Sequence, residues 1–136
     1  MTNSKNDAIR PFHIYLYGND RGPIPTSFEA TASRLEALPL LYFEPDGSFV
    51  WCRDRGEQQI YGMLYDAAGQ IQYCEIQGKC SLSTWIELRS AITGELATAG
   101  PVIGLQAMRL PEQELQELQS FEKSVWRSTA HRANAS

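Results

Sequence analysis

Few side chains in this sequence are able to do chemistry, and the carboxylates on two predicted β-hairpins stand out among them. Asp46 lies in the turn of the first hairpin, Asp66 precedes the turn of the second, and Glu75 lies on the return strand of the second. Carboxylates brought together at one edge of a sheet can hold a divalent cation and position water for phosphodiester hydrolysis. The sequence therefore offers Asp66 and Glu75 as candidate metal ligands.

The segment Glu75-Ile76-Gln77-Gly78-Lys79 resembles a hairpin strand of the PD-(D/E)xK nuclease superfamily. In that superfamily an aspartate on one strand and a Glu-x-Lys on the next bind the metal and orient water. The resemblance implies a metal-dependent nuclease-like enzyme, either active or degenerate. The chain departs from the family pattern at Gln77, where the family has lysine. Lys79 lies two residues further on, about 6–7 Å along an extended strand.

Other kinds of catalytic centre have little support in the sequence. The two histidines are His13, on a predicted strand, and His131, near the end of the chain, so a nucleophile with a histidine base has few candidates. The cysteines Cys52, Cys74 and Cys80 match no compact zinc pattern, and their odd number favours free thiols. The common glycine-rich phosphate loops are absent as well. We therefore expect no cofactor, and the sequence leaves open whether the protein is an enzyme.

Aromatic side chains on the predicted strands suggest a different kind of site. Tyrosine and tryptophan are favoured at protein interfaces because they combine a large apolar ring with a polar group. Grouped on one sheet face, these residues would form a recognition surface; alternatively, they are cross-strand pairs that stabilise a half-exposed sheet. The candidate surface residues are Tyr15, Tyr17, Tyr42, Trp51, Tyr65 and Tyr73.

The elements that would position these residues begin with the strands. Alternating apolar and aromatic residues predict strands at 12–17, 40–44, 49–53, 60–65, 70–77 and 101–108. Pro45-Asp46-Gly47 predicts the turn of the first hairpin, and residues 66–69 the turn of the second. In the strand at 70–77, the alternation predicts Ile71, Tyr73 and Glu75 on one face.

Three helices are predicted between and after these strands. Thr26 and Glu29 have the spacing of a capping box for a helix over residues 27–38, which Pro39 ends. Ser81 or Ser83 is expected to cap a second helix over residues 82–92, with a stop at 93–94. Pro111 is expected to open a third helix. Its predicted buried stripe is Leu115, Leu118, Phe121 and Val125.

This order predicts an α+β fold, strand–helix–four strands–helix–strand–helix. We expect a curved antiparallel sheet of five to six strands with two to three helices packed on one face. The element order resembles the TATA-binding-protein-like and helix-grip architectures. The 136 residues fit one domain, expected over residues 11–127, with flexible tails at 1–10 and 128–136.

Charge and hydropathy argue against some classes of partner. The net charge of −4 argues against a nucleic-acid partner. No apolar run approaches the length of about 20 residues that spans a bilayer, and the polar start of the chain lacks the pattern of a signal peptide, so we expect no membrane partner and a cytoplasmic location. The favoured hypothesis is a non-enzymatic protein-binding or self-assembly module, which uses the aromatic-rich sheet face to engage a protein partner or a second copy in a homodimer. The alternative is the nuclease-like enzyme.

Overall fold

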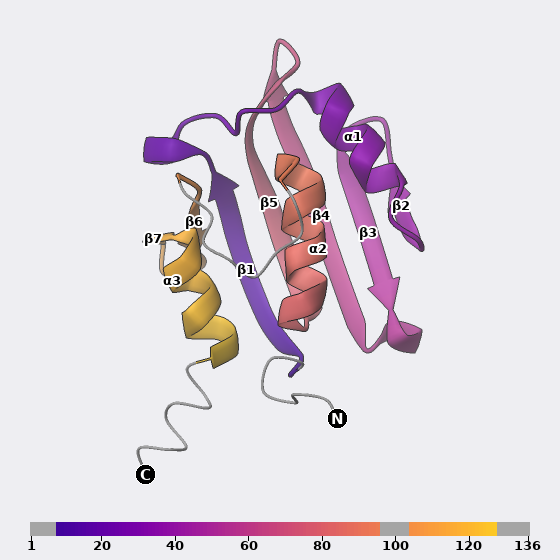
Figure 1. Cartoon of the computed structure of the whole chain (residues 1–136), viewed down its shortest axis with the longest axis vertical. Helices are drawn as coiled ribbons and strands as arrows, with labels where there is room; N and C mark the ends of the chain where they lie inside the picture. Colours follow the sequence, from indigo (N-terminus) through magenta and orange to yellow (C-terminus); the bar gives the residue numbers. More distant parts are fainter. Residues whose placement is uncertain (1–7, 96–103, 128–136) are drawn as a thin grey trace.

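The computed structural model describes residues 8–95 and 104–127, which form an open seven-stranded antiparallel sheet and three α-helices (Figure 1). The strand order is β2-β3-β4-β5-β1-β6-β7. The strands are β1 (Arg10–Tyr17), β2 (Leu41–Phe43), β3 (Ser48–Arg53), β4 (Gln58–Ala67), β5 (Gln70–Cys80), β6 (Gln106–Arg109) and β7 (Glu114–Glu117). The helices are α1 (Phe28–Glu36), α2 (Leu82–Thr93) and α3 (Leu118–Glu122), the last continuing into a π-helical turn at Lys123–Arg127.

The described helices lie on one face of the sheet (Figure 1), and the core fills the space between helices and strands. Alternate residues of each strand point into this core because side chains of an extended strand point to opposite faces. Ile14, Leu16, Ile60, Cys74 and Ile76 are at most 1% exposed. The α+β class and the antiparallel sheet predicted from the sequence are confirmed.

Aromatic rings join β1 to the helices, and an ion pair joins two of the helices to each other. The Phe12 ring on β1 lies 5.4 Å from the Trp85 ring on α2 and 5.6 Å from the Trp126 ring, between ring centroids. Beside these rings, Arg89 Nε of α2 lies 2.7 Å from Glu122 Oε2 of α3, and Trp85 Nε1 donates a hydrogen bond to the same oxygen. Arg89 is 1% exposed, so its charge is neutralised inside the core and α2 is tied to α3.

The end of the chain differs from the prediction. The sixth strand was expected at 101–108, but β6 begins at Gln106, and residues 101–103 lie outside the described part of the chain. The predicted helix opening at Pro111 is wrong. Gln113 takes a left-handed backbone conformation with φ 62°, and the next residues form β7, which pairs with β6. Leu115 therefore lies in a strand opposite Met108, and α3 begins only at Leu118.

The other two helices begin close to their predicted positions. Ser27 caps α1, since its Oγ accepts a hydrogen bond from the Ala30 N–H at 3.0 Å. The predicted capping residue Thr26 instead accepts a hydrogen bond from Arg34 Nη2. Ser81 caps α2, and Gly94, with φ 85°, ends it in the left-handed conformation that glycine adopts without strain.

A register shift in the second hairpin changes which side chains share a face. Tyr65 pairs with Tyr73, but the next residue, Asp66, pairs with Ile71, so Gln72 is an extra residue in β5. Such a bulge turns the preceding side chain to the other face. Ile71 is fully buried in the core, and the prediction that it shares a face with Tyr73 and Glu75 is wrong.

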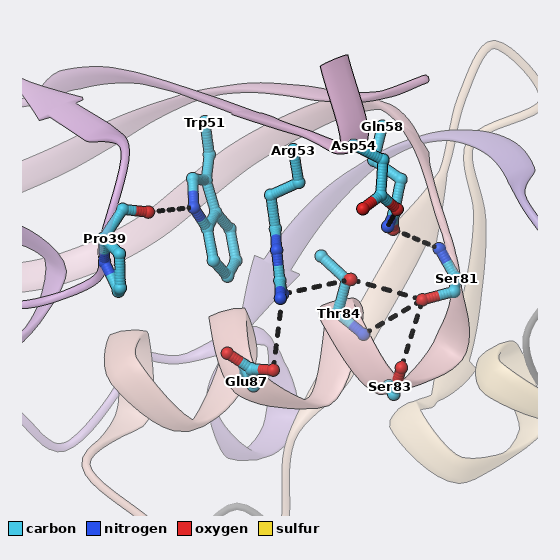
Figure 2. A network of polar contacts seen from close by, with 9 residues as sticks. All are labelled: Pro39, Trp51, Arg53, Asp54, Gln58, Ser81, Ser83, Thr84 and Glu87. Atoms are coloured by element: carbon cyan, nitrogen blue, oxygen red, sulfur yellow. Dashed lines mark hydrogen bonds and ion pairs between the residues drawn. The ribbon is translucent and has the colours of Figure 1, made fainter. Parts of the chain in front are cut away.

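A polar network holds the first turn of α2 against β3 and β4 (Figure 2). Gln58 on β4 is 6% exposed; its Oε1 accepts a hydrogen bond from the Ser81 N–H at 2.9 Å, and its Nε2 donates one to Asp54. Arg53 Nη1 on β3 lies 3.3 Å both from Thr84 Oγ1 and from Glu87 Oε2 (Figure 2). These contacts satisfy buried polar groups that would otherwise oppose the packing of α2 on the sheet.

The predicted tails lie mostly outside the described residues. In the first tail the description begins at Ala8, and Arg10 is already part of β1; the second tail, from residue 128, lies wholly outside it.

Among residues 8–95 and 104–127, none of the helices has the length and apolar character to cross a membrane.

The Gln58→Leu substitution tests the polar network. We expect it to lower the free energy of unfolding by about 1–3 kcal/mol, because the buried Ser81 N–H loses its acceptor and leucine offers no replacement. Urea denaturation of the two proteins measures the difference. Gln59→Leu, at the adjacent half-exposed position, serves as the matched control, and an equal cost for both substitutions would contradict this role of Gln58.

Candidate functional site

The face of the sheet opposite the helices carries the predicted surface residues, and strand pairing arranges them in rows across the sheet. We call this surface the open face. Its rows, read across the strands, are Tyr65, Tyr73, Tyr17, Gln106 and Glu117; then Ser48, Met63, Glu75, Tyr15, Met108 and Leu115; then Tyr42, Val50, Tyr61, Gln77 and His13; and finally Cys52, Gln59, Lys79 and Pro11.

The type of aromatic residue differs completely between the two faces of the sheet. All six tyrosines of the chain lie on the open face. The five phenylalanines and three tryptophans lie on the helix side of the sheet or in the helices. A buried phenol needs a hydrogen-bond partner whereas a phenyl ring does not, so tyrosine is suited to a surface and phenylalanine to a core. The open face therefore carries tyrosine rather than phenylalanine, as expected for a surface that is not buried in the core of the same chain.

Trp51 is the one predicted surface residue that lies on the other face. It is 1% exposed, and its Nε1 donates a hydrogen bond to the Pro39 carbonyl at 2.8 Å (Figure 2). The reason is strand alternation: the next residue, Cys52, points to the open face, so Trp51 must point into the core. Trp51 does not belong to the candidate surface.

Four tyrosines from three strands form a continuous cluster at one end of the open face. The Tyr65 and Tyr73 rings stack with 4.7 Å between centroids, and Tyr73 also contacts Tyr15 and Tyr17 at 5.3 and 5.5 Å. We call Tyr15, Tyr17, Tyr65 and Tyr73 the tyrosine cluster. Burial by neighbouring groups raises the pKa of both Tyr65 and Tyr73, and the negative charge of Glu75 raises both further.

The centre of the open face holds a histidine–glutamate pair and a shallow hollow. His13 Nε2 on β1 lies 2.8 Å from Glu75 Oε2 on β5, the middle strand of the sheet. Beside this pair, a hollow of about 100 Å³ is lined by Tyr61, Gly62, Met63, Glu75 and Gln77. The hollow is too small for a nucleotide but has room for one protruding side chain.

Beyond the tyrosine cluster, the open face remains accessible. Tyr42 is 67% exposed, Tyr61 49% and Leu115 39%. Tyr42 and Tyr61 flank Val50 in one row, while Met63 and Met108 lie on either side of the centre in the next. Apolar and aromatic groups thus extend from β2 to β7, across the width of the sheet.

The carboxylates named from the sequence do not come together. Asp66 Oδ2 accepts a hydrogen bond from the Gly69 N–H in its own turn, whereas Glu75 pairs with His13. Glu75 lies opposite Met63, three residues before Asp66 on β4, which is about 10 Å along the strand. Asp46 accepts hydrogen bonds from the Ser48 N–H and hydroxyl, which hold the pKa of Asp46 below its usual value.

No cluster of three or more histidine, cysteine or acidic side chains suited to a metal ion occurs within residues 8–95 and 104–127. The lysine of the nuclease resemblance also lies away from Asp66, because Lys79 pairs with Gln59 at the opposite end of β4. The geometry therefore does not favour a nuclease-like centre at Asp66 and Glu75.

The three cysteines are free thiols with different surroundings. Cys52 is exposed on the open face, while Cys74 and Cys80 are buried in the core. Burial raises the pKa of the Cys80 thiol to about 12 and raises that of Cys74 as well. The two buried thiols are therefore poor nucleophiles, because the thiolate is the reactive form.

Sequence reasoning missed the His13–Glu75 pair and the hollow, since both depend on which strands are neighbours. β1 pairs with β5 across more than fifty intervening residues. Strand alternation could have excluded Trp51 from the candidate surface, because its neighbours Val50 and Cys52 point to the open face.

Comparison of the chain with models of protein families, with curated proteins and with solved structures gives no match. The resemblances to the TATA-binding-protein-like and helix-grip architectures stay predictions, and the function has to be argued from the open face itself.

The raised pKa values of Tyr65 and Tyr73 predict a loss of stability at high pH. A phenol whose pKa is higher in the folded than in the unfolded protein contributes stability below its unfolded pKa, near 10.0, and this contribution is lost as the pH rises through the folded pKa. We therefore expect the free energy of unfolding to fall above about pH 10. Tyr73→Phe should reduce that fall, as measured by urea denaturation at a series of pH values. The same pH dependence in Tyr73→Phe and in the unaltered protein would contradict the prediction.

Proposed function

We propose that this protein is a non-enzymatic binding module and that its open face is the surface that engages another protein chain. The observation that carries the proposal is the division of aromatic residues, with all six tyrosines on the one face that the described helices leave uncovered. Tyrosine is among the residue types that contribute most to binding energy at protein interfaces.

Sheet stabilisation alone does not account for this arrangement. Within the tyrosine cluster the rings contact one another, and such cross-strand pairs do stabilise a sheet. Tyr42 and Tyr61, however, lie outside the cluster and remain about half exposed or more. Together with Val50, Met63 and Leu115 they extend the apolar surface to both sides of the sheet, and apolar patches of this breadth are typical of interaction sites.

The polar groups of the open face favour a protein as the partner. Lys79 is the only lysine or arginine among the residues of its rows, and one further cation, the Arg21 guanidinium, lies over the Tyr17 ring at their edge. Glu75 and Glu117 are acidic and offset these charges. A nucleic-acid backbone would require a basic surface. Tyrosine hydroxyls and the amides of Gln59, Gln77 and Gln106 provide the mixture of donors and acceptors found at protein interfaces. We also propose a cytoplasmic location, where thiols such as Cys52 remain reduced.

Site-specific photo-crosslinking tests this proposal. A photoreactive amino acid replaces Tyr61, at the edge of the central hollow, in the full chain expressed in its own cells. We expect covalent adducts with a protein chain, which mass spectrometry identifies. A second substitution on the open face, Tyr65→Lys, should greatly reduce their yield, because it places a charge in the tyrosine cluster.

Leu40 supplies the matched control for the crosslinking. It is 63% exposed, apolar, and lies in the loop between α1 and β2 rather than on the open face. The same photoreactive residue at position 40 should give few adducts. Equal yields from positions 40 and 61, or no adduct from position 61, would refute the proposed binding surface.

A further inference from the structure

We propose that the protein chain bound by the open face is a second copy of this protein, with the two open faces packed against each other around a two-fold axis. This inference rests on the proposed function of the open face and adds the identity of the partner. Four features of the described residues support it: the form of the sheet edges, the area of the face, its distribution of charge, and the match between its rows.

The sheet edges are poorly suited to joining two copies. The outermost strands are β2, with three residues, and β7, with four. Short edge strands offer few backbone groups to a neighbouring chain and are a common protection against edge-to-edge association. Two copies that associate through their sheets are therefore expected to use the faces.

The open face has the area that a dimer of this kind requires. With about 4.8 Å between strands and about 3.3 Å per residue, a seven-stranded face with its short outer strands covers on the order of 600 Å². Two such faces would together bury on the order of 1,200 Å², the lower end of the range for specific protein interfaces. Face-to-face sheets of this kind pack about 10 Å apart with their strands nearly aligned.

The charge on the open face permits contact with an identical surface. The charged groups in its rows belong to Glu75, Lys79 and Glu117. At the end of β1, the Arg21 guanidinium also lies over the Tyr17 ring, 5.4 Å from its centroid. Glu117 lies on an edge strand and Lys79 next to the end of β5, so only Glu75 lies in the centre. The Glu75 carboxylate already contacts the His13 ring. Its burial between two copies would leave that contact intact, which lowers the cost of removing the carboxylate from water.

One particular two-fold axis brings the rows of two open faces into favourable contact. An axis parallel to the strands and running between β5 and β1 places β4 of one copy over β6 of the other. Because Met63 and Met108 belong to the same row, the axis sets Met63 of each copy against Met108 of the other. It also sets Glu75 opposite Tyr15, whose hydroxyl is a donor. An axis directly over β5 would instead bring the two Glu75 carboxylates together, which is unfavourable.

A pair of charge variants tests both the partner and the axis. Within one copy, Met63 and Met108 are separated by β5 and β1, about 14 Å, beyond the screening length of about 8 Å at physiological salt. Charges at these positions therefore interact mainly between copies. Two double variants alter the same two positions. Met63→Lys/Met108→Lys places like charges against each other across the proposed axis, and Met63→Lys/Met108→Glu places opposite charges there.

Sedimentation velocity of the purified full chain over a wide concentration range measures the association. We expect the unaltered chain and Leu40→Lys to form dimers, and the Lys/Lys variant to remain monomeric. The Lys/Glu variant should self-associate at least about tenfold more tightly than Lys/Lys. Circular dichroism and thermal unfolding establish that each variant is folded, and a variant that fails this check is replaced by the same charge pattern at Ser48 and Leu115, which the axis also sets opposite each other.

Two results would overturn the inference. The first is an unaltered chain that stays monomeric at every concentration; if position 61 then crosslinks to a different protein, the open face binds a partner other than itself and the proposed function stands. The second is equal dimerisation of the Lys/Lys and Lys/Glu variants, which places the dimer contact elsewhere. In that case adducts at position 61 decide separately whether the open face binds any protein.

Discussion

Strand alternation is the constraint on which the rest of this structure depends. In β1, β4 and β5, the three central strands, one set of side chains is mostly apolar and buried, and the other set is mostly polar or aromatic. Because side chains of a strand alternate between faces, the helices can cover only the apolar side. A shift of one residue in any of these pairings would bury Glu75 or Tyr73 and expose Ile76 or Cys74. The open face is thus fixed by the same pattern that fixes the core.

The core and the open face use aromatic residues in different ways. Each tryptophan indole N–H donates a hydrogen bond to a protein acceptor: Trp51 to the Pro39 carbonyl, Trp85 to Glu122, and Trp126 to the Cys80 carbonyl. The indole N–H groups of the core are therefore all satisfied within the protein, as buried polar groups require. The tyrosines extend their rings over a surface where each hydroxyl can reach water or another chain. One face completes the fold, and the other has the composition of an interface.

Local sequence signals predicted much of the fold, and long-range pairing accounts for what they missed. Ser81 and Gly94 marked the ends of α2, and the turns at Asp46 and Gly69 marked both hairpins, because these residues act on their immediate neighbours. The helix expected from Pro111 failed because Leu115 has helical spacing to Leu118 but pairs with Met108 on β6. Spacing along the chain cannot distinguish those two states. The His13–Glu75 contact likewise depends on the pairing of β1 with β5, which no local signal reveals.

Contact between two open faces is measured most directly by the nuclear Overhauser effect between methionine methyl groups in a mixture of two differently labelled copies. The chain has three methionines, and Met63 and Met108 lie on the open face in one row, on either side of the proposed axis. Within one copy their backbones are about 14 Å apart, too far for a strong effect. We predict an effect from Met63 of one copy to Met108 of the other, which disappears on dilution to monomer. Methyl signals that do not change with concentration, with no effect between copies, would contradict a dimer formed through the open faces.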